Sequence, residues 1–174
     1  YSASATSMSS NVPAWAFEGG VEKMLERLRD PETRARLREE SNASHLGRWG
    51  DIYVSYLYSP ENQWMIGKSI TEIAEMQGGK DPADTCFDMV LAENDRVGEV
   101  NFGMCEEDIE YIMAQPFVMP GSDGEALPLD TPGKPHPRNF GTFVRYLAHY
   151  CRDRGVLTLE NAVQKMTSLP ASRI

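Results

Sequence analysis

The stretch CEEDIEYIMAQPFVMPGSDG, residues 105–124, decides the expected fold. Its first half carries acidic residues followed by apolar residues at helical spacing, which predicts a helix that Pro116 ends. Its second half predicts a short buried strand over residues 117–119 and then a turn. Asp123 therefore follows a strand directly and lies between two glycines. Because the loops at the carboxyl ends of parallel strands build the active sites of α/β proteins, Asp123 is a candidate catalytic residue. The alternative is a plain turn, since Ser-Asp-Gly is common turn chemistry.

Outward from this stretch, predicted helices alternate with short strands. Capping residues and apolar spacing predict helices over about 21–28, 31–40, 70–77, from 82 onward, 105–115, 140–154 and 158–167. Strands are predicted over about 51–57, 97–102 and 117–119. The polar start, residues 1–14, predicts a loop or a disordered arm. This alternation favours βα units and a parallel sheet. A closed barrel needs eight strands and typically about 250 residues, so 174 residues predict a helix-rich α/β chain that holds only part of such a barrel.

Composition limits the classes of partner and compartment. The net charge is −9, from 17 basic and 26 acidic side chains, which argues against binding to nucleic acid or to anionic membranes. No apolar run approaches the roughly 20 residues of a membrane span. The cysteines are Cys86, Cys105 and Cys151, an odd and widely spaced set that favours a reduced, cytoplasmic protein.

A second stretch, KPHPRNFGTF at residues 134–143, returns a Pro-rich loop to a helix. Arg138 in it is a candidate for gripping a substrate carboxylate, and the alternative is a rigid loop with a surface arginine. The histidines His45, His136 and His149 have neither HxH nor HExxH spacing. Any metal is therefore expected to be held mainly by ligands that this chain does not carry.

Four stretches together resemble the N-acyl-D-amino-acid deacylases of the amidohydrolase superfamily. They are YSASATSMSSNVPAWAFEGG (1–20), NFGMCEEDIEYIMAQPFVMPGSDG (101–124), KPHPRNFGTFVRYL (134–147) and LTLENAVQKMTSLPASRI (157–174). The resemblance implies that residues 1–174 form the C-terminal portion of a catalytic (β/α)₈ barrel, a partial TIM barrel. The upstream metal-binding strands and the closing segment of a β-sandwich would then be missing.

The family resemblance also implies an activity and a set of site residues. These enzymes use zinc to hydrolyse the amide of small-molecule N-acyl-D-amino acids. Asp123 matches the aspartate that shuttles the proton, and it is a possible metal ligand. Arg138, Tyr1 and Ser7 match the residues that hold the substrate carboxylate. The family's zinc-binding histidines have no counterpart here, so zinc is expected in the full-length enzyme but not on this chain, which is expected to be inactive alone.

Two departures and two alternatives accompany this interpretation. Cys105 replaces a helix-capping serine, and Asn139-Phe140 replaces the family's more common pairs after the HPR motif. One alternative is another amidohydrolase, such as a relative of the dihydroorotases or cyclic imidases. The other is a binding module without catalysis. An isolated part of a barrel exposes apolar faces and strand edges, so either self-association of the chain or a compact packing unlike a closed barrel is also expected.

Overall fold

The computed structural model describes all of residues 1–174, and the chain forms two compact units. The first unit consists of Tyr1–Ala3, Gly103–Thr131 and His136–Ile174. The second unit consists of Ser4–Phe102 and Pro132–Pro135. Along the chain, most of the second unit is therefore inserted between Ala3 and Gly103, and residues 132–135 also belong to it.

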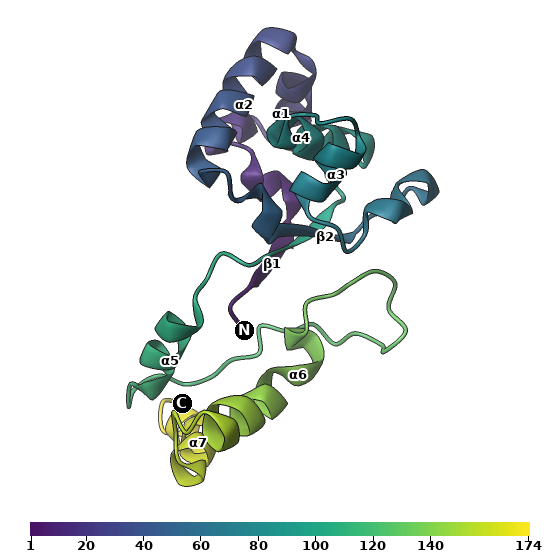
Figure 1. Cartoon of the computed structure of the whole chain (residues 1–174). Helices are drawn as coiled ribbons and strands as arrows, with labels where there is room; N and C mark the ends of the chain where they lie inside the picture. Colours follow the sequence, from purple (N-terminus) through teal and green to yellow (C-terminus); the bar gives the residue numbers. More distant parts are fainter. The chain divides into compact units, whose positions relative to one another are not determined.

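The second unit is built on a three-stranded sheet in the order β1-β3-β2. The central strand β3 (Gly98–Asn101) pairs antiparallel with both β1 (Ser4–Ser7) and β2 (Ile52–Tyr56). Strand β1 brings the chain into this unit and β3 takes it out, and the two lie side by side. Figure 1 shows helices α1 to α4 gathered to one side of these strands.

Local sequence signals explain the helices of the second unit, which are α1 (Val21–Arg29), α2 (Pro31–His45), α3 (Ile70–Met76) and α4 (Pro82–Ala92). The side chains of Asp30 and Asp81 cap α2 and α4, and proline follows each at the first helical position. Ser69 and Glu72 form the predicted capping box of α3. The apolar faces of these helices and the strands share one core, which includes Met8, Met24, Leu28, Leu37, Ile52, Val54, Ile70, Ile73, Phe87 and Val90.

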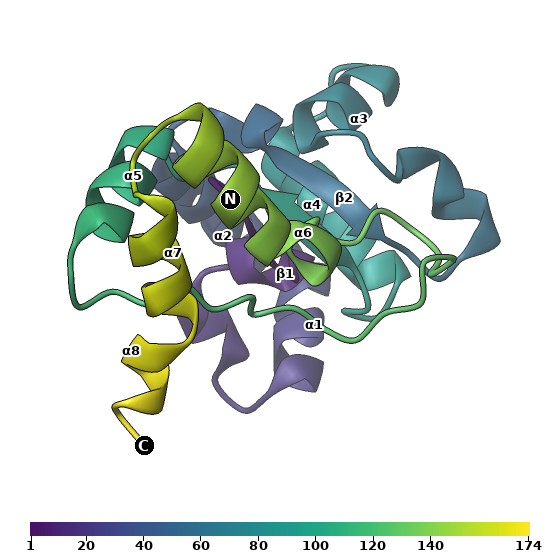
Figure 2. The same ribbon diagram turned by 90° about the horizontal axis from the view of Figure 1, so that it is seen from below.

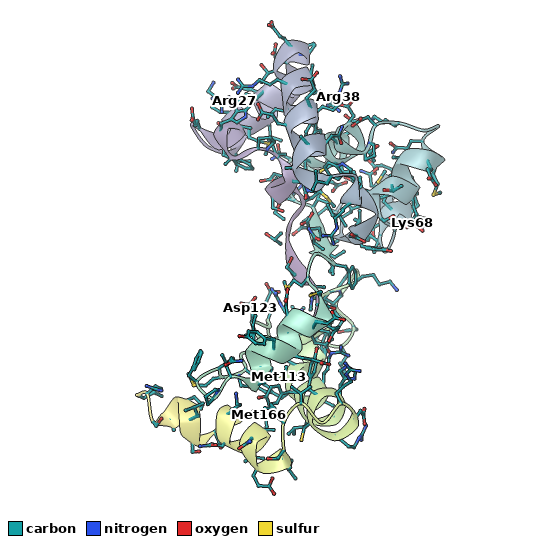
Figure 3. The ribbon with its side chains drawn as sticks, turned by 60° about the vertical axis from the view of Figure 1, so that its left-hand side comes forward. Arg27, Arg38, Lys68, Met113, Asp123 and Met166 are labelled. Carbon is teal, nitrogen blue, oxygen red and sulfur yellow. The ribbon has the colours of Figure 1, made fainter.

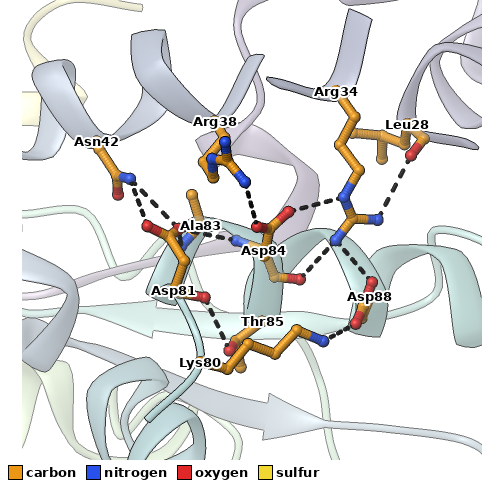
Figure 4. A network of polar contacts seen from close by, with 10 residues as sticks. All are labelled: Leu28, Arg34, Arg38, Asn42, Lys80, Asp81, Ala83, Asp84, Thr85 and Asp88. Atoms are coloured by element: carbon orange, nitrogen blue, oxygen red, sulfur yellow. Dashed lines mark hydrogen bonds and ion pairs between the residues drawn. The ribbon is translucent and has the colours of Figure 1, made fainter. Parts of the chain in front are cut away.

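An ion-pair network joins α2 to α4 on the rim of this core (Figure 4). Arg34 donates to the carboxylates of Asp84 and Asp88, each at 2.7 Å, and Arg38 donates to Asp84 at 3.0 Å. Lys80 pairs with Asp88 as well. Burial works against the Asp84 charge, but the bonds from Arg34 and Arg38 outweigh it and hold the pKa of Asp84 below its usual range.

The first unit is helical. It contains α5 (Glu106–Ala114), α6 (Arg138–Arg145), a π-helical continuation over Tyr146–Asp153, α7 (Leu159–Met166) and α8 (Ser168–Ala171), and Figure 2 follows α7 into α8 at the C-terminus. A small core of Tyr146, Leu157 and Ala162 holds the helices together, with Met113, Leu147 and Met166 packed against it. Gly155, with φ at +64°, ends the long helix where the sequence predicts a stop.

The helix-rich α/β class is confirmed, but three sequence predictions about strands are wrong. The sheet is antiparallel, because β3 runs opposite to both of its neighbours. Residues 4–7 form a strand, not a loop. Residues 117–119 form no strand: the Val118 amide closes a turn onto Gln115, and the Val118 carbonyl accepts from Lys165. A turn and the Lys165 side chain therefore take those backbone groups, and no ladder forms.

Two further features bear on the composition. No helix combines the length and the apolar character that crossing a bilayer requires. The three cysteines are free: Cys86 is buried, Cys151 half-buried and Cys105 exposed. Cys105 lies at the N-terminus of α5 without a side-chain capping bond, as expected for a weak cap.

Candidate functional site

Asp123 and Arg138 form an ion pair in the first unit, with 2.9 Å between Oδ2 and Nη1. The Asp123 side chain is 83% exposed and that of Arg138 is 24% exposed. Asp123 lies in an irregular segment beyond α5, and Arg138 is the first residue of α6. Figure 3 shows where Asp123 lies on this unit. The carboxylate is therefore accessible to small molecules, while most of the Arg138 side chain is shielded from solvent.

The glycine after Asp123 allows the two loops to meet. A Cβ on Gly124 would lie 3.1 Å from the carbonyl oxygen of Arg138 and 3.1 Å from the Cα of Asn139. The amide of Glu125 also donates to the Asn139 side chain at 2.8 Å. Asp123 itself has φ at +48°, a conformation that aspartate tolerates better than most residues. Gly121, by contrast, has open space around it, so close approach requires only the second glycine of the GSDG motif.

His136, two residues before Arg138, is buried and only 3% exposed. Its Nδ1 accepts from the backbone amide of Arg138 at 2.9 Å. Its Nε2 lies 3.0 Å from the carbonyl oxygen of Ala3. Burial is the main reason that the pKa of His136 is lowered, and the Arg138 charge acts in the same direction. His136 therefore connects the N-terminal segment to the start of α6.

Tyr1 packs against the same histidine. The two rings meet edge to face with centroids 5.3 Å apart. The Arg145 guanidinium lies 5.2 Å from the Tyr1 ring and 5.2 Å from the Tyr150 ring, so it is placed to interact with both. A Cβ on Gly141 would come within 2.6 Å of the Tyr1 hydroxyl, so the glycine of the GTF motif leaves room for that hydroxyl.

Glu106 completes the surroundings of Tyr1, and sequence reasoning missed it. Its carboxylate accepts from the Tyr150 hydroxyl at 2.7 Å and from Arg145 at 3.2 Å. Burial opposes its charge, but bonds from Tyr150 and Ser2 and the Arg145 charge outweigh burial and lower the pKa of Glu106. Glu106 stands in the acidic first turn of α5, which the sequence explains by the helix dipole alone. Only its bonds to Arg145 and Tyr150, which form when the chain folds, distinguish Glu106 from the other acidic residues of that turn.

Ser7 lies in the second unit, at the end of β1. Its hydroxyl caps the following 3₁₀ turn by accepting from the Ser9 amide at 3.4 Å, and it donates to Asp95 at 3.3 Å. Of the four predicted site residues, the structure thus brings three, Tyr1, Asp123 and Arg138, into one unit. The fourth makes local contacts in the other unit.

The side chains of this chain that could bind a metal ion do not form a metal site. The 174 residues contain no group of three or more His, Cys, Asp or Glu side chains that could hold a metal ion. Asp123 stands alone as a carboxylate, and its near neighbour is a cation. The residues present therefore do not fit a zinc ion by themselves.

We compared the chain with proteins of known sequence and structure. No family model matches the chain. It is 44% identical over 109 residues to the D-aminoacylase of Alcaligenes xylosoxydans xylosoxydans, a match that covers 63% of this chain and 20% of the relative. Over this stretch, the chain is similar to an N-acyl-D-amino-acid deacylase. The N-acyl-D-glutamate deacylase of the same organism is 42% identical over 107 residues, which is 60% of this chain and 20% of that deacylase.

Solved deacylase structures agree with the sequence relationship. The N-acyl-D-glutamate deacylase of Bordetella bronchiseptica, complexed with zinc and a phosphonate inhibitor, matches with a TM-score of 0.59 and 26% identity. That match covers 90% of this chain and 39% of the solved chain. A D-aminoacylase that defines a subset of amidohydrolases matches with a TM-score of 0.57 and 30% identity, over 93% of this chain and 34% of that chain. The sequence matches thus span about a fifth of the length of the curated deacylases.

Proposed function

We propose that this chain is the C-terminal portion of the catalytic domain of an N-acyl-D-amino-acid deacylase. In that enzyme it supplies the proton-transfer carboxylate and the groups that bind the substrate carboxylate. The observation that carries the proposal is the cluster of Asp123, Arg138 and Tyr1 in one unit, held together through His136. These four residues all lie in stretches that resemble the family. A protein named D-aminoacylase is 44% identical to this chain over 109 residues.

Arg138 is suited to the substrate's free carboxylate. Its guanidinium already binds one carboxylate, that of Asp123, through Nη1. Its remaining N–H donors have the fork geometry that pairs with a carboxylate through two parallel bonds. Tyr1 reaches the same region, because its hydroxyl lies over Gly141 in the first turns of α6. An arginine and a tyrosine would together fix the carboxylate end of an N-acyl-D-amino acid and orient its α-carbon.

Asp123 is suited to proton transfer. Amide hydrolysis requires that a proton leave the attacking water and that another reach the departing amine. The Asp123 carboxylate is 83% exposed, so water and substrate reach it freely. Its contact with Arg138 also places it beside the group proposed to hold the substrate. The carboxylate would take the proton from water and then deliver it to the amine nitrogen.

Zinc is part of the proposal for the whole enzyme and not for these residues. The Bordetella deacylase is described with zinc, and another solved D-aminoacylase is described with a binuclear metal centre. The 174 residues of this chain offer no cluster able to hold such an ion. The metal would therefore be held mainly by residues elsewhere in the enzyme.

Asp123→Asn in the enzyme that contains this chain tests the proposal. We expect turnover of N-acetyl-D-amino acids to fall by about 10²- to 10⁴-fold, the range typical of a lost general base, while the fold is kept. Asp130→Asn is the matched control, because Asp130 is an exposed aspartate of the same long loop. Wild-type rates in Asp123→Asn would reject the role. Hydrolysis of dihydroorotate or hydantoins, with none of N-acetyl-D-amino acids, would favour a cyclic amidase instead.

A further inference from the structure

The two hydrogen bonds of His136 determine where its proton lies. The backbone amide of Arg138 is a donor only, so the Nδ1 that it contacts at 2.9 Å must be unprotonated. The carbonyl of Ala3 is an acceptor only, so the Nε2 that it contacts at 3.0 Å must carry a hydrogen. Both bonds exist together in one protonation state of the ring, the neutral Nε2–H tautomer.

Each bond holds a different part of the candidate site. The bond at Nδ1 fixes the backbone of Arg138, whose side chain is proposed to grip the substrate carboxylate. The bond at Nε2 fixes Ala3, two residues after Tyr1, and the ring of His136 also packs against the Tyr1 ring. These segments are more than 130 residues apart in the sequence. No other side chain is bonded to both of them.

We propose that His136 is a positioning residue, which as the neutral Nε2–H tautomer sets the distance between Tyr1 and Arg138 and so adapts the site to a carboxylate. This inference rests on the proposed function for the identity of the ligand, but not for the geometry. It concerns how substrate is held, and it assigns no proton transfer to the ring.

Burial supports this assignment. The ring is 3% exposed, and a charged imidazole there would turn a second N–H toward the Arg138 amide. The Arg138 charge lowers the pKa of His136, in addition to the larger effect of burial, while the Ala3 carbonyl and the Asp123 charge act in the opposite direction.

Three substitutions separate the two bonds. His136→Asn keeps an oxygen near the Nδ1 position and retains the bond to Arg138, whereas His136→Gln keeps an amide near Nε2 and retains the bond to Ala3. His136→Phe retains neither and preserves the ring. His149→Phe is the matched control, because His149 is a half-buried histidine of the same unit.

The kinetic test compares an N-acetyl-D-amino acid with its carboxamide in the enzyme that contains this chain. We expect His136→Phe to raise KM for the acid by about 10- to 100-fold, the scale of a misplaced binding group. We expect kcat for the acid and both constants for the carboxamide to change little. Arg138→Ala provides the reference for a lost grip on the carboxylate. Equal losses on acid and carboxamide would mean a merely structural role and would overturn the inference.

A spectroscopic test separates this inference from the proposed function. In the 174-residue chain, two-bond ¹H–¹⁵N correlations at neutral pH should show a protonated Nε2 and an unprotonated Nδ1 for His136. The Arg138 amide resonance should move in His136→Phe and His136→Gln but stay near its wild-type position in His136→Asn. A protonated Nδ1, or an equal shift in all three variants, would overturn the inference. If the wild-type enzyme hydrolyses no N-acyl-D-amino acid but these resonances behave as expected, the proposed function fails and the positioning role stands.

Discussion

Replacing Glu99 by glutamine should stabilise the second unit at alkaline pH and leave it unchanged at acid pH. Glu99 lies on the central strand β3 and is 1% exposed. Ser10 donates to one of its oxygens at 3.1 Å and the Asn11 amide donates to the other. No cation pairs with it, so burial raises its pKa from 4.5 to about 7.

The sign follows from which state holds the proton. Between pH 4.5 and about 7, the folded state keeps a proton on Glu99 that the unfolded chain has released. The free energy of unfolding therefore falls as pH rises through this window. The full difference corresponds to about 3 kcal/mol at about 1.36 kcal/mol per pKa unit, an upper limit. Burial also opposes the charge of Glu93, but hydrogen bonds from Asn62, Ser59 and Tyr58 outweigh it and lower its pKa, so Glu93 acts only at more acid pH.

Urea unfolding followed by tryptophan fluorescence reports on this unit alone, because Trp15, Trp49 and Trp64 all lie in it. At pH 8 we expect the free energy of unfolding of Glu99→Gln to be about 1–3 kcal/mol higher than that of wild type. At pH 4, where Glu99 is mostly protonated in the folded and the unfolded state, the two free energies of unfolding should agree within about 0.5 kcal/mol. The glutamine accepts from Asn11 and donates to the Ser10 hydroxyl. Glu75→Gln, on the exposed face of α3, is the control. A difference between Glu99→Gln and wild type that does not depend on pH, or a variant weakened at pH 8, would refute the reasoning.

Two further substitutions test contacts within each unit, one substitution per unit. Arg34→Met removes the bonds to Asp84 and Asp88 and should lower the free energy of unfolding of the second unit by about 2–3 kcal/mol. The exposed Lys23→Met should cost less than about 1 kcal/mol in the same fluorescence assay, and equal losses would contradict a special role for Arg34. Lys165→Met removes the ammonium that binds three backbone carbonyls between residues 113 and 118, so amide exchange over residues 115–119 should accelerate. Unchanged exchange there would show that the turn before Asp123 holds without Lys165.

The sequence by itself determined where most of the helices begin. Asp30, Ser69 and Asp81 cap helices within four residues of themselves, and such short-range bonds can be read from the sequence. The same applies to the strand at 52–56, with its β-branched and aromatic residues. It also singled out Asp123 and Arg138, because unusual glycines, prolines and charges surround both.

Only the tertiary structure decided how distant segments meet. The direction of β3 depends on two partners far away in sequence, and periodicity carries no information about strand direction. Residues 117–119 have the apolar character of a strand, yet Lys165 and a local turn take their backbone groups. His136 appeared in the sequence as part of a rigid loop, because its two partners and its burial exist only after folding. The hydrogen bond between His136 and Ala3 joins residues 133 positions apart, and the protonation state of the ring depends on that bond. Both are properties of packing, which no local sequence pattern encodes.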